Sequence, residues 1–217
     1  MEGSTKKYTW KIMISFVENI DCMVGIAKFP DNFFDLAIVD PPYGLPDDSV
    51  HGRGKLKNRV LNSMNTDWDV KPTDKYFIEL FRVSKNQCIW GGNYFELPAT
   101  RGICIWDKDQ PFDNFSAFEY CWTSFQTTSR IYKEATTRTN ELKIHPTQKS
   151  IKLYKWLLKN YAKAGDKILD THLGSGSSRI ACYDGGFDFW GYEIDKDYFE
   201  SQEKRFKNHI SQLQLSL

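Results

Sequence analysis

The chain has 217 residues and a nearly balanced charge, with 29 Lys and Arg residues against 28 Asp and Glu residues. Hydrophobic residues make up 41% of it and aromatic residues 15%, which excludes a disordered chain and suits one core, whereas two full domains would be cramped. No apolar stretch is long enough to cross a membrane, and the first eleven residues lack an apolar signal region, so we expect one cytoplasmic domain over residues 1–217.

Apolar runs and turn residues predict elements along most of the chain. Strands are expected at 12–17, 36–39, 87–90, 102–106, 119–125, 167–169 and 189–192. Helices are expected at 22–28, 73–84 and 148–164, after Ser177, and from 197 to about 209. Because helices separate most of the strands, the pattern predicts an α/β fold with a mainly parallel sheet covered on both faces. The fourth and fifth strands have no helix between them and predict one antiparallel hairpin.

Residues 40–43 read Asp-Pro-Pro-Tyr and directly follow the apolar run 36–39, which is typical of a buried strand. The two prolines donate no N–H and fix φ, so they end the strand in a stiff turn. In an open α/β sheet, ligands bind at that edge. The carboxylate of Asp40 beside the ring of Tyr43 suits a planar substrate that carries an amino group. Taken alone, such a tetrapeptide is more often only a turn that ends a strand.

Residues 170–178 read Asp-Thr-His-Leu-Gly-Ser-Gly-Ser-Ser, between a short apolar strand and a helical stretch. This is the context of a cofactor loop, because glycines let a ligand approach the backbone and a helix N-terminus favours negative charge. Glu193 ends the next strand about 20 residues later, where it can accept hydrogen bonds from ribose hydroxyls. The phosphate-loop pattern is absent and the dinucleotide pattern incomplete, so a nucleoside cofactor with a carboxylate tail fits better.

A third motif, His-Pro-Thr-Gln-Lys at 145–149, precedes an amphipathic helix for which Thr147 is the candidate cap. Together the three motifs resemble the DNA amino-methyltransferases, which use S-adenosylmethionine to methylate adenine N6 or cytosine N4. The resemblance spans roughly residues 11–206, and the motif order resembles the permuted beta class. It implies a Rossmann-like sheet of seven strands. The chain departs from the family at Thr171-His172, where Pro-Phe is usual.

The resemblance implies a site-specific transfer of methyl to the N6 amine of a flipped adenine, through a catalytic turn made of Asp40, Pro41, Pro42 and Tyr43. Asp40 and the carbonyl of Pro41 would accept the amino hydrogens, and Tyr43 would stack on the base. The residues expected to hold the cofactor are Asp21, Asp40, His145, Thr147, Gln148, Lys149, Asp170, Leu173, Gly174, Ser175, Gly176 and Glu193. For Asp21 a simple helix cap is an almost equal alternative. The four histidines are scattered, and we predict no metal.

Two basic segments are expected to contact DNA phosphates, with a solvated loop surface as the alternative. The first follows the catalytic turn and contains Arg53, Lys55, Lys57 and Arg59, and the second contains Arg130, Lys133, Arg138, Lys143 and Lys149. The predicted strands and helices leave only residues 44–72 and about 126–144 for target recognition. We therefore expect a short or loosely read site, or dependence on a homodimer or a partner protein.

Other functions stay open at this point. A cytosine-N4 methyltransferase would share the layout, although that subgroup more often has serine where Asp40 stands. An RNA adenine methyltransferase could use the same basic surface, and a protein-glutamine methyltransferase would more usually have asparagine at that position. A non-catalytic cofactor- or DNA-binding module is the alternative from a different class, and the intact Asp40 and Tyr43 argue against it. The enzyme could belong to a restriction–modification system, to a phage or mobile element, or to regulation. A solitary enzyme is favoured over one paired with a nuclease.

Overall fold

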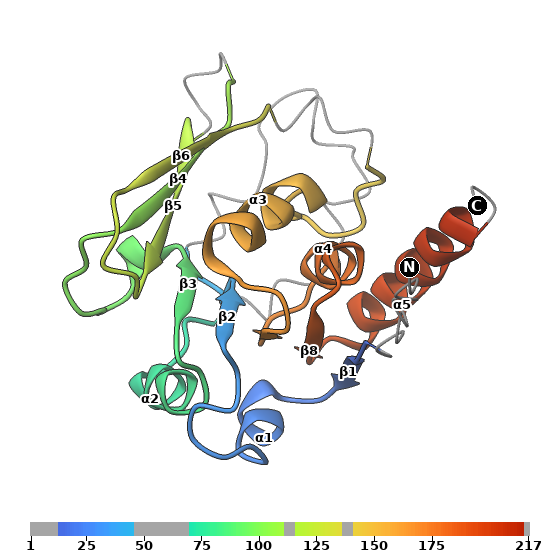
Figure 1. The fold of residues 1–217 in the computed structure, drawn as a ribbon, viewed down its shortest axis with the longest axis horizontal. Coiled ribbons are helices and arrows are strands. Elements are labelled where there is room, and N and C mark those ends of the chain that lie inside the picture. The colour runs from blue at the N-terminus through green and yellow to red at the C-terminus, as the bar shows by residue number, and fades with distance from the viewer. Residues whose placement is uncertain (1–12, 46–69, 111–115, 136–140, 215–217) are drawn as a thin grey trace, which may run out of the picture.

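In the computed structural model, residues 13–45, 70–110, 116–135 and 141–214 are described. The strands of these residues form one eight-stranded sheet with the order β1-β8-β7-β2-β3-β5-β4-β6 (Figure 1). Their bounds are β1 Ser15–Asn19, β2 Leu36–Val39, β3 Gln87–Trp90, β4 Ile103–Asp107, β5 Phe118–Thr123, β6 Arg130–Lys133, β7 Lys167–Asp170 and β8 Asp188–Glu193. Only β5 runs antiparallel to its neighbours β3 and β4. The predicted mainly parallel α/β sheet with one antiparallel hairpin is therefore confirmed.

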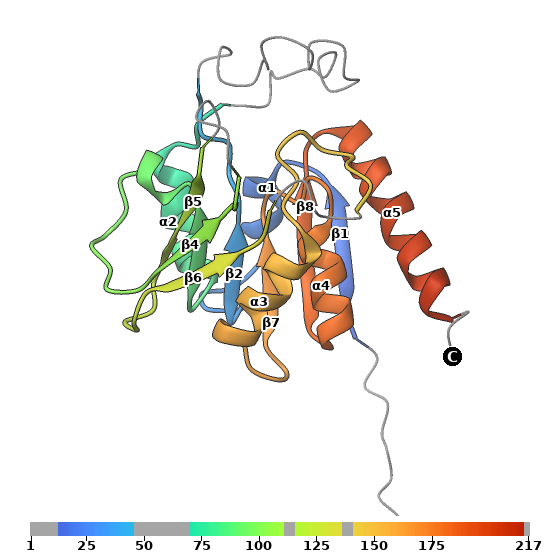
Figure 2. The same ribbon diagram turned by 90° about the horizontal axis from the view of Figure 1, so that it is seen from above.

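Helices cover both faces of the sheet, with α3 and α4 on one side and α1 and α2 on the other (Figure 2). Their bounds are α1 Cys22–Ile26, α2 Asp74–Val83, α3 Ile151–Tyr161, α4 Ser177–Gly185 and α5 Lys196–Gln214, with a 3₁₀ turn, η3, at Gly92–Tyr94. The last helix, α5, packs against α4 and β8. No helix of the described residues is long and apolar enough to span a membrane.

The run of apolar residues in β2 reflects burial on both faces. Leu36 and Ile38 belong to the core that includes α3 and α4, whereas Ala37 and Val39 belong to the core that includes α1 and α2. A strand in this position cannot alternate apolar and polar residues, because neither face meets water. This double burial makes β2 a rigid base for the turn that follows it.

The centre of the sheet is the point at which its strand order reverses. β2 and β7 are parallel neighbours there. From β2 the chain passes through α2 to β3 on one side, and from β7 it passes through α4 to β8 on the other side. A crevice opens outside the carboxyl ends of the strands at such a switch point. Asp40, which follows β2, and Asp170, which ends β7, therefore meet at one crevice.

The eighth strand, β6, was not predicted from the sequence. It lies inside the segment expected to serve target recognition, and it pairs with β4 at the edge of the sheet. Three of its four residues are exposed, so an apolar pattern typical of a buried strand is missing. The prediction of seven strands was therefore one short within the described residues.

Some predicted boundaries also differ from the structure. The first strand begins at Ser15, and the last helix continues to Gln214. The helix after the third motif begins at Ile151, and its cap is Ser150, whose hydroxyl oxygen accepts a hydrogen bond from the Leu153 N–H at 3.1 Å. The expectation that Thr147 caps this helix was wrong.

Leu157 tests the core between α3 and the sheet, because its side chain is fully buried there. Leu157→Ala should lower the free energy of unfolding by about 2–5 kcal/mol through lost burial and the cavity left behind. The matched control is Ile78→Ala on α2, where the side chain is 64% exposed and the change should stay within about 0.5 kcal/mol. Urea unfolding measures the free energy of unfolding of both variants. Equal decreases in the two variants would contradict the placement of α3 against the sheet.

Candidate active site

A cavity of about 340 Å³ lies at the switch point of the sheet. Its volume falls in the range of roughly 300–1,000 Å³ that small-molecule sites occupy. The loops that follow β1, β2, β7 and β8 supply much of its wall, together with α2 and α5. The lining residues are Asp21, Cys22, Met23, Asp40, Pro42, Val70, Pro72, Thr73, Tyr76, His145, Thr171, His172, Gly174, Glu193, Ile194 and Tyr198.

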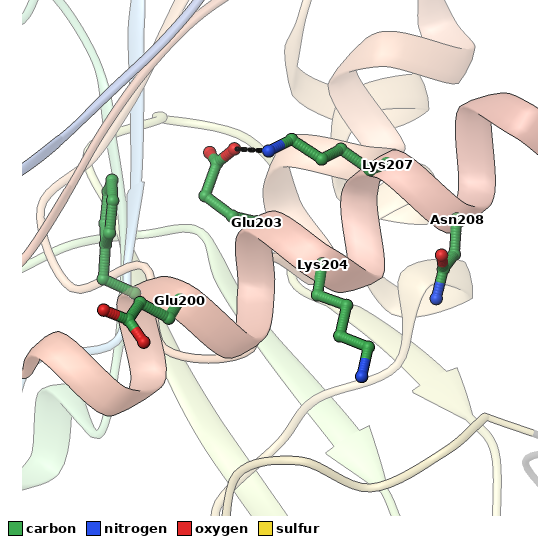
Figure 3. Close-up of a pocket in the computed structure, with 6 residues that line it drawn as sticks. Glu200, Glu203, Lys204, Lys207 and Asn208 are labelled. Atoms are coloured by element: carbon green, nitrogen blue, oxygen red, sulfur yellow. Dashed lines mark ion pairs between the residues drawn. The ribbon is translucent and has the colours of Figure 1, made fainter.

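A second hollow of about 470 Å³ lies on α5, lined by Phe199, Glu200, Glu203, Lys204, Lys207 and Asn208 (Figure 3). All six residues come from this one helix, and Glu203 and Lys207 form an ion pair at 3.9 Å across it. A single helix face cannot enclose a ligand, and among the described residues no second element lines this hollow. The cavity at the switch point is therefore the candidate site.

Within the turn at residues 40–43, one hydrogen bond and one stacked ring hold Tyr43. The Tyr43 hydroxyl donates to Asp40 Oδ1 at 2.7 Å. The Tyr43 ring stacks on Tyr94, with 4.9 Å between the ring centroids and 22° between the planes. Gly91 makes room for this ring, because a Cβ built there would lie 2.1 Å from Tyr43 Cε1, and its φ of +66° also favours glycine. The orientation of Tyr43 is therefore fixed before any substrate arrives.

A series of alternating charges leads to the other oxygen of Asp40. Lys149 Nζ donates to Asp40 Oδ2 and also lies 3.0 Å from Glu119 Oε2. Lys108 Nζ lies 2.7 Å from the remaining oxygen of Glu119. The Lys149 side chain is only 2% exposed, so its ammonium depends on the two carboxylates for its polar contacts. We call these four residues, Asp40, Lys149, Glu119 and Lys108, the charge series.

Burial and ion pairing shift the pKa values of Asp40, Lys149 and Glu119 in opposite directions. Burial raises the pKa of Asp40 above its ordinary value, and the Lys149 ammonium works against that rise. Burial alone would lower the pKa of Lys149, but Asp40 and Glu119 raise it above the ordinary lysine value. Burial would raise the pKa of Glu119, but the two lysines lower it to about 2. At neutral pH, Lys149 is therefore an ammonium and Glu119 a carboxylate.

The glycine loop after β7 is held from both ends by carboxylates. Asp170 accepts hydrogen bonds from the His172 N–H at 3.1 Å and the Ser178 hydroxyl at 2.5 Å, and burial raises its pKa to about 7. The Gly174 N–H donates to Glu193 Oε2 at 2.7 Å, and the φ of Gly174 is +49°. This left-handed conformation, which glycine adopts more readily than other residues, brings the loop backbone to the cavity wall.

Two acidic residues stand beside the part of the cavity wall formed by β8 and α1. The other oxygen of Glu193 accepts the Asp195 N–H at 2.9 Å, so its carboxylate joins the glycine loop to the start of α5. Asp21 caps α1 by accepting the Met23 N–H at 2.7 Å, and it also lines the cavity. The two interpretations of Asp21 as a cap and as a cavity residue are therefore compatible.

Of the third motif, only His145 lines the cavity, and the residues after it form a tight local turn. The His145 ring lies 4.3 Å from the Tyr198 ring, and burial lowers the His145 pKa to about 4, which leaves the imidazole neutral at pH 7. The Thr147 hydroxyl lies 3.1 Å from His145 Nδ1. Gln148 accepts the Ile144 N–H at 3.0 Å with its side-chain oxygen. Thr147 and Gln148 therefore make hydrogen bonds within their own loop.

The residues expected to hold a cofactor divide into two groups. Those that line the cavity are Asp21, Asp40, His145, Gly174 and Glu193. Those outside its lining are Thr147, Gln148, Lys149, Asp170, Leu173, Ser175 and Gly176. Lys149 was also expected to contact phosphate, and this was wrong because its ammonium is buried on two carboxylates.

The residues expected to contact DNA lie partly outside the described residues, and Arg138 is one of these. Arg53, Lys55, Lys57 and Arg59 fall in the range 46–69, outside the described residues. Arg130 is exposed at the start of β6. That strand is four positions from β2 in the sheet, or about 19 Å at the usual strand spacing. Arg130 therefore cannot touch a base held at Asp40.

Several residues of the site were missed from the sequence. Tyr94 follows Gly91-Gly92 at the end of β3, and its place just past a strand was an available signal. Glu119 is an acid inside a strand of large apolar residues, which was also a signal. Tyr76 on α2 shares a hydrogen bond of 2.6 Å with the Thr171 hydroxyl, and Tyr198 enters the cavity from α5. No spacing along the chain connects these last two residues to the motifs.

Comparisons with known proteins identify the relatives of this chain. The N6/N4 family model described as DNA methylase matches residues 69–204. The Type II methyltransferase M2.MboI of Moraxella bovis is 23% identical over 236 residues, which cover 86% of this chain and 85% of that protein. The crystal structure of the M1.HpyAVI–SAM complex is similar with a TM-score of 0.58 at 19% identity, over 88% of this chain and 98% of that one. PvuII DNA methyltransferase, cytosine-N4-specific, gives a TM-score of 0.61 at 13% identity, over 89% and 87%.

His172 tests the burial of the loop beside the cavity. Burial lowers its pKa from 6.5 to about 4, so between these values the unfolded chain binds a proton that the folded protein does not. The free energy of unfolding should therefore fall as the pH drops through this window. His172→Phe keeps a ring against Tyr76 and removes the titration. Between pH 7 and pH 5 the variant should lose about 2 kcal/mol less stability than the wild type in urea unfolding.

His145 has a similarly lowered pKa and is present in both proteins, so its contribution cancels in the comparison. Equal losses of stability in the wild type and His172→Phe would show that the imidazole at position 172 is not excluded from water.

Proposed function

The chain belongs to the N6/N4 family of DNA methylases, and on this basis we propose that it transfers a methyl group from S-adenosylmethionine to adenine N6 in DNA. The observation that carries the proposal is the arrangement of Asp40, the Gly174 backbone and Glu193 around one cavity. A hydrogen-bond acceptor for the reacting amine and a nucleoside-binding loop must share a site for a direct transfer. The fold brings them together from the ends of β2, β7 and β8.

The cavity residues fit S-adenosylmethionine. The cavity volume of about 340 Å³ suits a small molecule. A related structure, M1.HpyAVI, was solved with this cofactor. We assign Glu193 to the ribose hydroxyls and Asp21 to the adenine, because both supply carboxylate acceptors at the wall. The Gly174 backbone and His145 would face the methionine end. S-adenosylmethionine supplies an electrophilic methyl group, so the reaction needs no covalent bond to the protein.

Asp40 and Pro41 activate the amine of the substrate. The lone pair of an exocyclic amine is delocalised into the ring, which makes it a poor nucleophile. A carboxylate and a carbonyl that accept its two hydrogens favour a tetrahedral nitrogen and stabilise the positive charge that develops there. Each oxygen of Asp40 already accepts one bond, from Tyr43 or Lys149, but a carboxylate offers about four acceptor sites. The amine can therefore bind without displacing either partner.

Tyr43 holds the base. The amine is hidden inside a duplex, so the adenine must be flipped out to reach Asp40. Stacking of a base on an aromatic ring contributes about 1–3 kcal/mol. The Tyr94 ring already stacks on Tyr43 and is 39% exposed, so the two rings form a rigid aromatic platform beside the catalytic carboxylate. Alignment of the two reactants on this platform would supply a further part of the acceleration.

Transfer to cytosine N4 is the second candidate function. It is favoured by the similarity to PvuII DNA methyltransferase, whose name states that specificity. Asp40 favours adenine. In the family that this chain resembles, the cytosine-N4 subgroup more often carries serine at that position. Nucleoside analysis of the methylated product distinguishes the two bases directly. Phosphate contact by the basic residues at 51–59, and target recognition through a homodimer or a partner protein, stay predictions.

Cofactor binding is the first test of this proposal. Titration calorimetry of the folded protein in the presence of a metal chelator should show binding of S-adenosylmethionine. Glu193→Ala should weaken the affinity about tenfold or more, because ribose loses a charged acceptor worth about 1.5–3 kcal/mol. Glu200→Ala, an exposed glutamate on α5, is the matched control and should bind as the wild type does. Absence of binding by the folded wild type would remove the basis of the proposal.

Methyl transfer is the second test. With labelled S-adenosylmethionine and adenine-containing DNA, the wild type should produce N6-methyladenine. Asp40→Ala should slow the transfer about 10²–10³-fold, the usual effect of removing one preorganised electrostatic partner, and leave cofactor affinity largely intact. Asp31→Ala removes an exposed aspartate paired with Arg82 and should leave the rate unchanged. A normal rate for Asp40→Ala would rule out the catalytic role of the turn.

A further inference from the structure

The charge series connects the catalytic carboxylate to groups that the proposed mechanism does not use. Lys108 Nζ lies 2.7 Å from Glu119 Oε1, and Lys149 Nζ lies 3.0 Å from Glu119 Oε2. Lys149 in turn donates a hydrogen bond to Asp40. Neighbouring members have opposite signs, and the four charges sum to zero. Water hardly reaches Lys149, whose side chain is 2% exposed, whereas the side chains of the other three residues are 15–23% exposed.

The sheet determines where these charges lie. Glu119 on β5 is the register partner of Trp106 on β4, and Lys108 comes directly after β4. Two indole rings flank the cations, with Trp90 centred 5.2 Å from Lys149 Nζ and Trp106 centred 5.3 Å from Lys108 Nζ. Each ring favours a cation over its face and leaves it little freedom to move. Contacts with Asp40, Glu119 and the Trp90 ring thus hold the Lys149 ammonium in place.

Stability alone does not explain such an arrangement. Removing charges from water costs several kcal/mol per ion, and a buried ion pair rarely stabilises a fold more than apolar residues of similar size would. A buried pair with shifted proton affinities that contacts a residue of a cleft is instead typical of a functional site. Here the pair is in contact with the carboxylate that would accept a hydrogen from the substrate amine, so its effect on that carboxylate is the relevant one.

We propose that Lys149 is a positioning residue for methyl transfer, which keeps Asp40 ionised and oriented, and that Glu119, anchored by Lys108, limits how far Lys149 neutralises it. The assignment rests on the proposed function, because it concerns the reaction of Asp40. An Asp40 without Lys149 would tend to bind a proton and lose its acceptor. An Asp40 that faced Lys149 alone would give up much of its negative potential to the ammonium. Glu119 shares that ammonium and leaves Asp40 a strong acceptor.

The proposal predicts effects of opposite sign at two residues. The groups that face Asp40 are the hydroxyls of Tyr43, Tyr76 and Tyr154, the carboxyls of Asp170 and Glu119, and the ammonium of Lys149. Burial raises the pKa of the three tyrosines, so their hydroxyls stay neutral. Lys149 lowers the Asp40 pKa, and Glu119 raises it. Loss of the lysine should raise that pKa, and loss of the glutamate should lower it.

The test is a direct titration of Asp40 by carbon-13 NMR in the full chain labelled at aspartate Cγ, with Asp40→Asn used to identify the signal. Lys149→Met should move the Asp40 midpoint to higher pH, and Glu119→Gln should move it to lower pH. Lys155→Met is the matched control, because this lysine on α3 pairs with Asp184 at 2.6 Å and makes no contact with Asp40. It should leave the midpoint unchanged. Shifts of the same sign, or no shift, in the two test variants would overturn the proposal.

Activity supplies a second readout. The acid limb of the kcat profile should shift to higher pH in Lys149→Met and to lower pH in Glu119→Gln, with little change in the KM for S-adenosylmethionine. Lys149→Arg keeps the charge and should recover much of the wild-type profile. If Lys149→Met does not fold, Glu119→Gln still decides, because a midpoint that moves to higher pH or stays unchanged would overturn the proposal. A wild type that binds the cofactor and transfers no methyl would refute the proposed function, whereas the NMR midpoints would still decide whether Lys149 and Glu119 set the ionisation of Asp40.

Discussion

The parallel pairing of β2 with β7 is the constraint on which the rest of this structure depends. The two strands are neighbours, yet the chain leaves them toward opposite sides of the sheet, through α2 and through α4. This reversal opens the crevice and brings Asp40 and the loop around Gly174 to the same edge. Asp40 and Gly174, which are 134 positions apart in the sequence, therefore line the same cavity. The apolar cores on both faces of β2 keep that edge rigid.

Burial at this edge governs the chemistry of its charged groups. It raises the pKa of Asp170 to about 7 and lowers that of His145 and His172 to about 4, so both histidines are neutral at pH 7. Lys149 and Glu119 stay charged only because each has partners of opposite sign. The site thus combines a dry interior with a few paired ions, in which electrostatic interactions are stronger than in water. A developing charge on a substrate nitrogen would be felt strongly there.

Local patterns in the sequence were sufficient for most of the fold. The apolar run of β2, the glycine loop after β7 and the third motif before α3 each carry their signal within a few neighbouring residues. The same holds for the antiparallel hairpin of β4 and β5, which no helix separates. β6 was not predicted, because an exposed edge strand lacks an apolar pattern. The cap of α3 was predicted three residues too early, because Thr147 and Ser150 are both suitable caps.

The sequence by itself determined which residues stand at strand ends, and with them the places of the Asp-Pro-Pro-Tyr turn, the glycine loop and Glu193. Only the tertiary structure decided what each of these residues contacts. Lys149 reads as a surface lysine in a basic segment, yet it binds Asp40, which lies 109 positions away. Tyr94 and Glu119 reach the turn through β3 and β5 in the same way. The physical reason is that spacing along the chain defines neighbours within one element, whereas neighbours across the sheet depend on strand order and register.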